Sequence, residues 1–432
     1  MPMNFQALID DAARAHDVPG AAIAIGHDGD LIEAATGVLN RTTGVPTTPD
    51  SLFQIGSVTK PLTAMLVLQL VDEGLVALDE PVRRYLPDFA VLDPAASAAV
   101  TVRHLLSNTA GFDGDLFEDT GRGDDALDRY LAHLARNAGQ VHAPGGMYSY
   151  CNSGFATAGA LIARLRGAPW EAVLRERLIE PLGLTHTTSF AEEAILFRVA
   201  AGHLDGKVTT EWQWPRALGP AGTVVCAAPR DLVTLGRLFL DGGEHAAMMT
   251  PQVGVPGVPG RDARQYGLGL DLYEWNGVGV VGHNGGTIGQ SAMWRVIPSH
   301  GVVIAGALNG GDATAFADAV LDPIVAELTG VIVPPRSVPS GATGPGPAEY
   351  AGRYEHSMYR YDVVATDTGL DITATGKGVA AGDRSSERYV ALTNDTFITA
   401  EPNGGVHSTL TFVDGGRYLH NGRAAGRVLT ST

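Results

Sequence analysis

Strand-like runs lie at both ends of the first 330 residues, and this placement limits the possible folds strongly. Residues 19–25 and 31–35 are apolar runs joined through Asp28-Gly29, a dipeptide that favours a tight hairpin turn. Later runs rich in β-branched and aromatic residues lie at 266–275, 278–283, 290–297 and 301–308. Helical patterns fill the region between. The sequence therefore predicts an α+β fold, with one antiparallel sheet flanked by helices and an all-helical subdomain inserted into it.

A second domain is predicted beyond residue 332. Residues 333–347 contain five prolines and four glycine or alanine spacers without periodic pattern, which is typical of a linker. Short β-branched and aromatic runs follow at 361–365, 370–375, 389–392, 396–400, 408–413 and 417–420. Their regular spacing predicts a small antiparallel β-barrel. The expected organisation is a first domain at 1–332, a linker at 333–347 and a β domain at 348–432.

Composition excludes several classes of partner. The formal net charge of −17 argues against nucleic acid and anionic membrane surfaces, since both attract basic patches. Apolar runs stay shorter than a membrane-spanning helix, and the first residues lack the basic and apolar regions of an export signal, so we expect a cytoplasmic protein. The two cysteines, Cys151 and Cys226, have no metal-ligand spacing, and we expect neither a metal site nor a cofactor.

The first candidate for chemistry is Ser57-Val58-Thr59-Lys60, directly before the apolar run 62–71. A serine and a lysine three residues apart at the start of a helix share one face, so the amine can reach the hydroxyl. Lysine occurs at only three positions in the chain, and arginine supplies the other basic residues. Because a buried lysine can lose its proton and an arginine cannot, this pair suits a nucleophile beside a base.

Two further elements could complete a site. Tyr150 and Asn152, two residues apart in an expected extended loop, would point the same way and offer a phenol and an amide, although a tyrosine is more often a packing residue. The other element is Gly282-His283-Asn284-Gly285-Gly286, where glycines on a strand would let a substrate backbone approach closely. A histidine there is, taken alone, more often a structural residue.

In this order and at these separations, the three elements resemble the serine β-lactamase and penicillin-binding-protein-like family, over about residues 5–330. The Tyr-x-Asn motif of the second element resembles that of one branch of this family, which contains class C β-lactamases, D-aminopeptidases, esterases and peptide-cyclising thioesterases. Asn284 stands where threonine is usual, which weakens the case for β-lactamase activity. The resemblance implies Ser57 as nucleophile, Lys60 as base, Tyr150 as proton relay, and Asn152 and His283 as supporting catalytic groups. The backbone amides of Ser57 and Gly286 would form the oxyanion hole.

Other features bear on the substrate. The segment 350–354 resembles the opening of lipocalin-like domains appended to D-aminopeptidases and cyclising thioesterases. The expected substrate-binding residues lie in the third element, just ahead of the glycine-rich turn 219–222 and in the C-terminal tail: Asn284, Gly285, Trp212, Trp214, Arg423 and Arg427. These features favour acyl transfer from a peptide with a D-residue at the acyl position, by hydrolysis or head-to-tail cyclisation as in nonribosomal peptide release. The substrate would be a small molecule or peptide, which could be presented as a thioester on a carrier protein. An esterase, a class C β-lactamase-like hydrolase and a catalytically silent binding protein are the alternatives.

Overall fold

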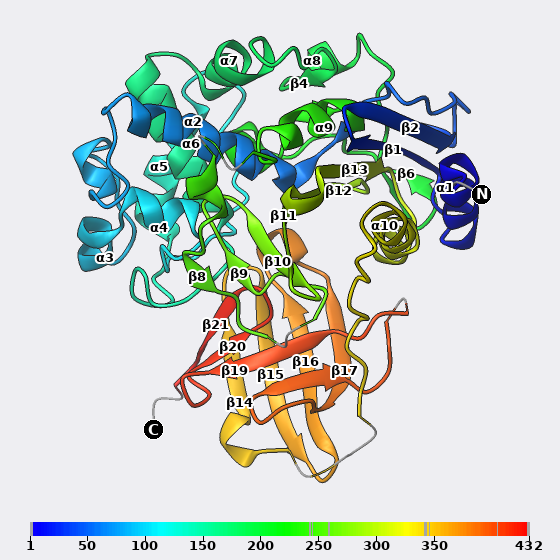
Figure 1. Ribbon diagram of the computed structural model, residues 1–432. Coiled ribbons are helices and arrows are strands. Elements are labelled where there is room, and N and C mark those ends of the chain that lie inside the picture. Colours follow the sequence, from blue (N-terminus) through cyan, green and yellow to red (C-terminus); the bar gives the residue numbers. More distant parts are fainter. Residues whose placement is uncertain are drawn as a thin grey trace.

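The computed structural model describes residues 3–241, 243, 245–257, 260–340, 344, 346–403 and 405–429. Helices surround an antiparallel sheet in the larger part, and a closed barrel follows at the C-terminus (Figure 1). The predicted α+β class, with an antiparallel sheet, flanking helices and a C-terminal β-barrel, is confirmed.

The large sheet has eight strands in the order β2-β1-β13-β12-β11-β10-β9-β8. Their bounds are β1 Gly20–His27, β2 Asp30–Gly37, β8 Val253–Gly254, β9 Gln265–Tyr266, β10 Asp271–Trp275, β11 Val278–Gly286, β12 Ser291–Ile297 and β13 Val302–Leu308. The N-terminal hairpin joins the late strands through β1 and β13, where Ala21 pairs with Leu308 and Ile25 with Ile304. The sheet is thus completed from both ends of the segment, as the sequence predicts.

The predicted strand at 266–275 is interrupted. Residues 267–270 leave the sheet between β9 and β10, and Gly269 adopts φ of 74° there. A Cβ added at Gly269 would lie 2.7 Å from the Cβ of Ala64. The interruption therefore lets this loop pack closely on the helix that contains Ala64.

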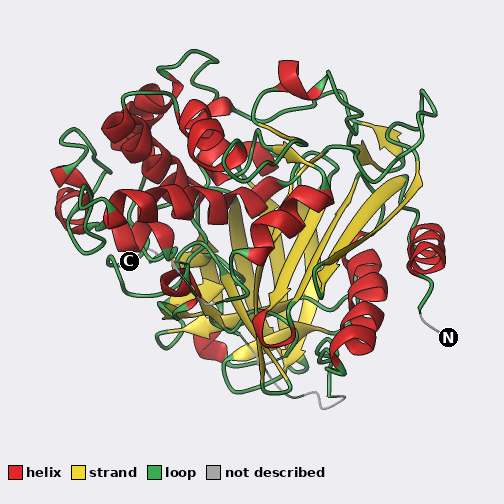
Figure 2. Cartoon of the chain, turned by 45° about the horizontal axis from the view of Figure 1, so that its top comes forward, coloured by secondary structure: helices red, strands yellow, loops and turns green. Residues whose placement is uncertain are grey.

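Alternate residues of β1 point into two separate cores on opposite faces of the sheet. The helices are α1 Phe5–Ala15, α2 Thr59–Asp72, α3 Pro94–Ala99, α4 Val102–Leu106, α5 Ala126–Asn137, α6 Asn152–Arg166, α7 Trp170–Leu174, α8 Ala191–Ala194, α9 Pro229–Arg237 and α10 Ala313–Thr329. Ala22 and Ala24 face a core shared with α2 and α9. Ile23 faces a core shared with α1 and α10. Helices therefore cover both faces (Figure 2).

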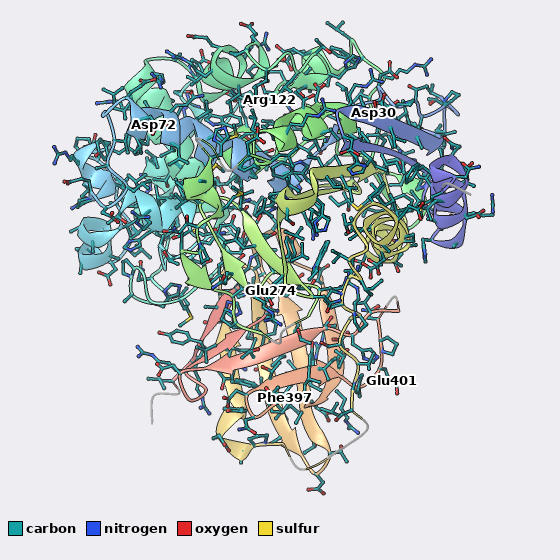
Figure 3. All side chains as sticks on the ribbon, viewed as in Figure 1. Asp30, Asp72, Arg122, Glu274, Phe397 and Glu401 are labelled. Carbon is teal, nitrogen blue, oxygen red and sulfur yellow. The ribbon has the colours of Figure 1, made fainter. Side chains whose placement is uncertain are left out.

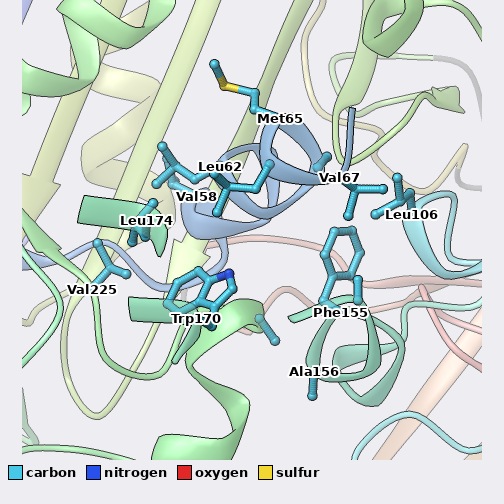
Figure 4. Close-up of a cluster of buried hydrophobic side chains, with 14 of the residues drawn as sticks. Val58, Leu62, Met65, Val67, Leu106, Phe155, Ala156, Trp170, Leu174 and Val225 are labelled. Atoms are coloured by element: carbon cyan, nitrogen blue, oxygen red, sulfur yellow. The ribbon is translucent and has the colours of Figure 1, made fainter. Parts of the chain in front are cut away.

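Helix α2 lies deep in the helical part. Eleven of its fourteen residues are buried, and a helix that is apolar on nearly all sides is expected to be enclosed by others. Figure 4 shows Leu62 and Met65 of this helix in a cluster that also contains Phe155 of α6 and Trp170 of α7. This packing fixes the helix that carries Lys60.

Besides the large sheet, two smaller sheets are formed by residues between β1 and β8. One is formed by β3 Phe53–Gln54, β4 Thr187–Thr188 and β7 Cys226–Ala227, and the other by β5 His203–Leu204 and β6 Lys207–Val208. Among the described residues, no helix combines the length and apolar composition needed to cross a bilayer.

The C-terminal barrel has eight antiparallel strands. They are β14 Gly352–Glu355, β15 Tyr359–Thr366, β16 Gly369–Gly376, β17 Arg384–Ala391, β18 Thr396–Thr399, β19 Thr409–Val413, β20 Tyr418–His420 and β21 Ala424–Arg427. The first and last strands, which the run pattern alone does not predict, pair with each other and close the barrel. Its core includes Phe397, labelled on the barrel in Figure 3, and Phe412, whose ring stacks on Tyr350 at 4.1 Å.

The segment between α10 and the barrel has no helix or strand over residues 330–340. Its start is anchored, because Val333 packs in the core below α10 and Arg336 pairs with Asp318 at 2.5 Å. Residues 341–343 and 345 of the predicted linker lie outside the described residues. The domain limits 1–332, 333–347 and 348–432 stay a prediction.

Candidate active site

Ser57 lies in a single 3₁₀ turn, Gly56–Val58, between strand β3 and helix α2. Glycines crowd the backbone of this turn from two sides. A Cβ added at Gly222 would lie 2.3 Å from the carbonyl oxygen of Gly56, and one added at Gly285 would lie 1.8 Å from the carbonyl oxygen of Ile55. Because the surrounding backbones fit so closely, the position of Ser57 is fixed by its neighbours.

Lys60 lies in the first turn of α2 and is fully buried. Its Nζ atom lies 3.0 Å from Ser57 Oγ, 2.7 Å from Asn152 Oδ1 and 2.7 Å from the carbonyl oxygen of Ala221. The serine and lysine that are three residues apart in sequence are therefore in hydrogen-bond contact.

The contacts of Lys60 suit a neutral amine. The oxygens of Asn152 and Ala221 can only accept, so each takes one N–H of the amine. A neutral amine then has a lone pair left for the Ser57 hydroxyl. Burial lowers the pKa of Lys60 well below its ordinary value, against the opposing attraction of the Asp115 carboxylate. The lysine can therefore accept the serine proton.

Tyr150 approaches the same serine from the loop before α6. Its hydroxyl donates to Ser57 Oγ at 2.5 Å, and Lys60 Nζ lies 4.5 Å from the centre of its ring. Burial raises the pKa of Tyr150 above its ordinary value, so the group remains a phenol. The expected extended loop ends early, because Asn152 is already the first residue of α6 and Cys151 caps that helix. Tyr150 and Asn152 nevertheless both reach the Ser57–Lys60 pair.

His283 lies on β11 and is buried. Its ring centre is 6.2 Å from that of Tyr150, and its Nδ1 lies 2.5 Å from the carbonyl oxygen of Asn284. Burial lowers the pKa of His283, so a neutral ring borders the site. His283 therefore lies next to the group formed by Ser57, Lys60 and Tyr150.

The next two residues of β11, Asn284 and Gly285, both contact other parts of the protein. The Asn284 side chain lies on the other face of the strand, where its Oδ1 accepts from Arg295 Nη2 at 2.8 Å. Gly285 allows a close backbone approach, but the approaching backbone is Ile55 of the Ser57 turn and not a substrate. A role for either residue in binding substrate receives no support from this placement.

The two tryptophans ahead of the 219–222 turn have different surroundings. The Trp212 indole donates to the carbonyl oxygen of Ala200 at 2.9 Å and packs on a small buried cluster with Leu52. Trp214 packs edge-on against Phe117, with ring centres 5.2 Å apart, and lines a pocket together with Phe190. Both side chains are half-buried, and Trp214 is the one that borders this pocket.

The two C-terminal arginines also separate. The guanidinium of Arg423 binds the Asp115 carboxylate and lies over the Tyr150 ring, 4.9 Å from its centre. Arg427 instead donates to the carbonyl oxygens of Glu349 and Ala351, within its own domain. The structure therefore brings Arg423 to the site and keeps Arg427 away from it.

Asp115 is a site residue that the sequence did not indicate. It lies in the acidic, glycine-rich segment 113–145. Its side chain is only 2% exposed and accepts from Asn152 Nδ2 at 2.7 Å. One aspartate among many in such a segment gives no signal, because its burial depends on residues far away in sequence.

The comparisons with known proteins agree with this geometry. The family model described as Beta-lactamase matches residues 5–329. Penicillin-binding protein 4 of Amycolatopsis lactamdurans is 42% identical over 372 residues, covering 82% of this chain and 97% of that protein. The structure of SurE with D-Leu has a TM-score of 0.78 and 28% identity, covering 98% of both chains.

A further solved structure matches the first part of the chain. The D-amino acid amidase of Ochrobactrum anthropi SV3 has a TM-score of 0.63 and 26% identity, covering 74% of this chain and 97% of the amidase. The family model spans well over half of the chain, and a buried lysine contacts the serine three residues before it. The chain therefore belongs to the beta-lactamase family of serine hydrolases and acyltransferases.

Proposed function

We propose that the protein transfers an acyl group from a peptide whose reacting carbonyl belongs to a D-residue, through an ester formed on Ser57. The observation that carries the proposal is the buried amine of Lys60, 3.0 Å from Ser57 Oγ, with its N–H groups directed at two acceptors. A desolvated amine beside a serine hydroxyl is an activated nucleophile–base pair.

In the first step the Ser57 Oγ forms a bond to the substrate carbonyl carbon, and its proton passes to Lys60 Nζ. The negative oxygen that develops is stabilised by the backbone amides of Ser57 and Gly286. These two lie close together, since a Cβ added at Gly56 would be 2.5 Å from the Gly286 nitrogen. Both amides can therefore bind the oxygen of the tetrahedral intermediate that forms on Ser57.

In the second step the bond from the carbonyl carbon to the leaving group breaks. Tyr150 gives its hydroxyl proton to the departing nitrogen or sulfur and regains a proton from the Lys60 ammonium, which returns both groups to their starting state. Water or the peptide's own terminal amine then attacks the carbonyl carbon of the Ser57 ester and loses a proton to the same groups. The bond from that carbon to Ser57 Oγ breaks, Ser57 Oγ takes the proton back, and a free acid or a cyclic peptide is released. Asn152 holds Lys60 in place throughout.

Two observations support a D-residue at the acyl position. SurE, which matches this chain over 98% of its length including the barrel, was solved with D-Leu. The matched amidase is named for D-amino acids. A peptide thioester on a carrier protein would deliver such a carbonyl in activated form.

The experiment offers the protein matched linear peptide thioesters that differ only in the D or L configuration of the C-terminal residue. We expect an acyl-enzyme by intact mass with the D-peptide, turnover at least tenfold faster than with the L-peptide, and neither with Ser57→Ala. Separating linear acid from cyclic product by mass distinguishes hydrolysis from cyclisation.

Other results select the alternatives. Equal turnover of both configurations, or rapid cleavage of p-nitrophenyl esters without peptide turnover, makes the protein an esterase. Fast release of acyl groups from penicillins makes it a β-lactamase-like hydrolase. If the folded wild type does not react with a fluorophosphonate, it is a binding protein and the proposal is wrong.

A further inference from the structure

A row of polar side chains leads from the nucleophile to the C-terminal barrel. Lys60 Nζ donates to Asn152 Oδ1, and Asn152 Nδ2 donates to Asp115 Oδ1, each at 2.7 Å. Asp115 in turn accepts from Arg423 Nε and, at 3.2 Å, from Arg423 Nη2. The first three residues belong to the catalytic part, and Arg423 comes from the turn between β20 and β21 of the barrel.

The burial of Asp115 requires its negative charge to be balanced by a nearby positive charge. Its side chain is 2% exposed, and a buried carboxylate is costly unless it is paired and hydrogen-bonded. Arg423 is the cation that pairs with it. Without Arg423, the negative charge of Asp115 would be unbalanced, and only the side chain of Asn152 lies between it and the amine of Lys60.

The same turn of the barrel also holds the loop that carries Tyr150. The Tyr150 amide donates to the carbonyl oxygen of Gly422 at 3.0 Å, and the amide of Ala424 donates to Ser149 Oγ at 3.1 Å. The ring of His420 lies 2.9 Å from the carbonyl oxygen of Tyr148. The barrel therefore forms hydrogen bonds with three consecutive residues, the last of which is Tyr150.

We propose that Asp115 is a positioning residue for Asn152 and that Arg423 supplies its countercharge, so that the catalytic group is complete only with the barrel docked. The inference rests on the proposed role of Lys60 as base. It gives Arg423 an electrostatic task inside the protein, separate from any contact with substrate.

The electrostatic consequence can be stated with its sign. The negative Asp115 raises the pKa of Lys60 and the positive Arg423 lowers it, beneath the larger lowering caused by burial. The other titratable groups around the amine are Cys151, Asp271, Tyr150 and His283. Losing Arg423 alone therefore raises the Lys60 pKa, and losing the Asp115 charge alone lowers it.

The test follows the titration of Lys60 directly. The chain has three lysines, so selective ¹³Cε-lysine labelling gives three NMR signals, and Lys207→Arg and Lys377→Arg assign the other two. We expect Arg423→Gln to raise the Lys60 pKa by about 1 unit or more, the size of one unit charge in a partly buried site. Asp115→Asn, which keeps an acceptor for Asn152, lowers it, and the double variant returns close to the wild type.

A kinetic measurement on the same single and double variants checks the NMR result. The rate of fluorophosphonate labelling of Ser57 falls at low pH as Lys60 becomes protonated. This acid limb should move to higher pH in Arg423→Gln and return in the double variant. An unchanged Lys60 titration in Arg423→Gln, or no return in the double variant, overturns the proposal and leaves Arg423 as a substrate-binding residue only.

Controls separate this result from misfolding and from failure of the proposed function. The exposed barrel pair Arg388–Asp371 at 2.9 Å provides matched variants, Arg388→Gln and Asp371→Asn, that should leave Lys60 unchanged. If Arg423→Gln does not fold, Arg423→Lys keeps the charge, and a shift of 1 unit in that variant counts against the proposal. The NMR titration needs no substrate, so it remains decisive even if D-peptides are not turned over.

Discussion

Lys60 and Tyr150 make opposite demands on the oxygen of Ser57. In the proposed reaction the lysine amine takes its proton, whereas the tyrosine hydroxyl keeps a proton to give to the leaving group. Burial serves both, because it disfavours charge: it lowers the pKa of the lysine and raises the pKa of the tyrosine. The same desolvation therefore prepares a base and an acid 3.0 and 2.5 Å from one atom.

Replacing Lys60 by methionine tests this at the residue scale. Lys60→Met keeps an unbranched side chain but removes the base, and we expect fluorophosphonate labelling of Ser57 to slow by about 10²–10⁴-fold. The rate is measured by intact mass, with urea unfolding as the check on folding. Labelling within tenfold of the wild-type rate in a folded variant would show that another group takes the serine proton.

Strand β11 works by presenting different faces at successive residues. His283 faces the site, Asn284 faces Arg295 on the opposite side, and Gly285 receives the backbone of the Ser57 turn. Asn284 stands where the family usually has threonine, and its side chain lies away from Ser57. The glycine is instead required by the close contact between two elements.

Gly285→Ala tests that contact at the scale of the element. The new Cβ would lie 1.8 Å from the carbonyl oxygen of Ile55, so strand and turn must separate. We expect the free energy of unfolding to fall by about 1–3 kcal/mol and the labelling of Ser57 to become slower. Gly279→Ala is the matched control on β11, because a Cβ there meets no atom within 4 Å. Equal stability of the two variants would refute the tight contact.

At the scale of the whole molecule, the barrel contributes buried histidines on its side facing the catalytic part. The ring of His420 bonds to Tyr148, and its Nδ1 lies 3.3 Å from the Gly422 amide, so both nitrogens are used in the neutral form. Burial lowers the pKa of His420 to about 4 and that of His356 to about 4. Protonation of either ring therefore opposes the folded state.

This predicts a loss of stability in mild acid. The unfolded chain takes up protons at these histidines below about pH 6.5, while the folded chain does so only near pH 4, so stability falls as the pH drops between these values. Each histidine should contribute a loss of about 2 kcal/mol between pH 7 and pH 5. Urea unfolding of His420→Gln should show a correspondingly flatter pH dependence, whereas the partly exposed His300→Gln should not. Identical slopes for all three proteins would contradict the assignment.

The sequence by itself determined the order of elements and the contact between Ser57 and Lys60. Periodicity predicts strands and helices because it reflects which face of each element is buried, and the serine–lysine spacing is local to one helix. The hairpin at Asp28-Gly29 was likewise readable, since both residues adopt positive φ in the turn.

Tertiary structure alone decided what depends on distant parts of the chain. Asp115, Arg423 and the barrel turn reach Lys60 and Tyr150 from positions up to 363 residues away from Lys60, and no local pattern specifies such contacts. The same holds for the face of β11 on which Asn284 lies and for the domain in which Arg427 is bound. Burial and partner, which set the charge state of each group, arise only when these segments pack together.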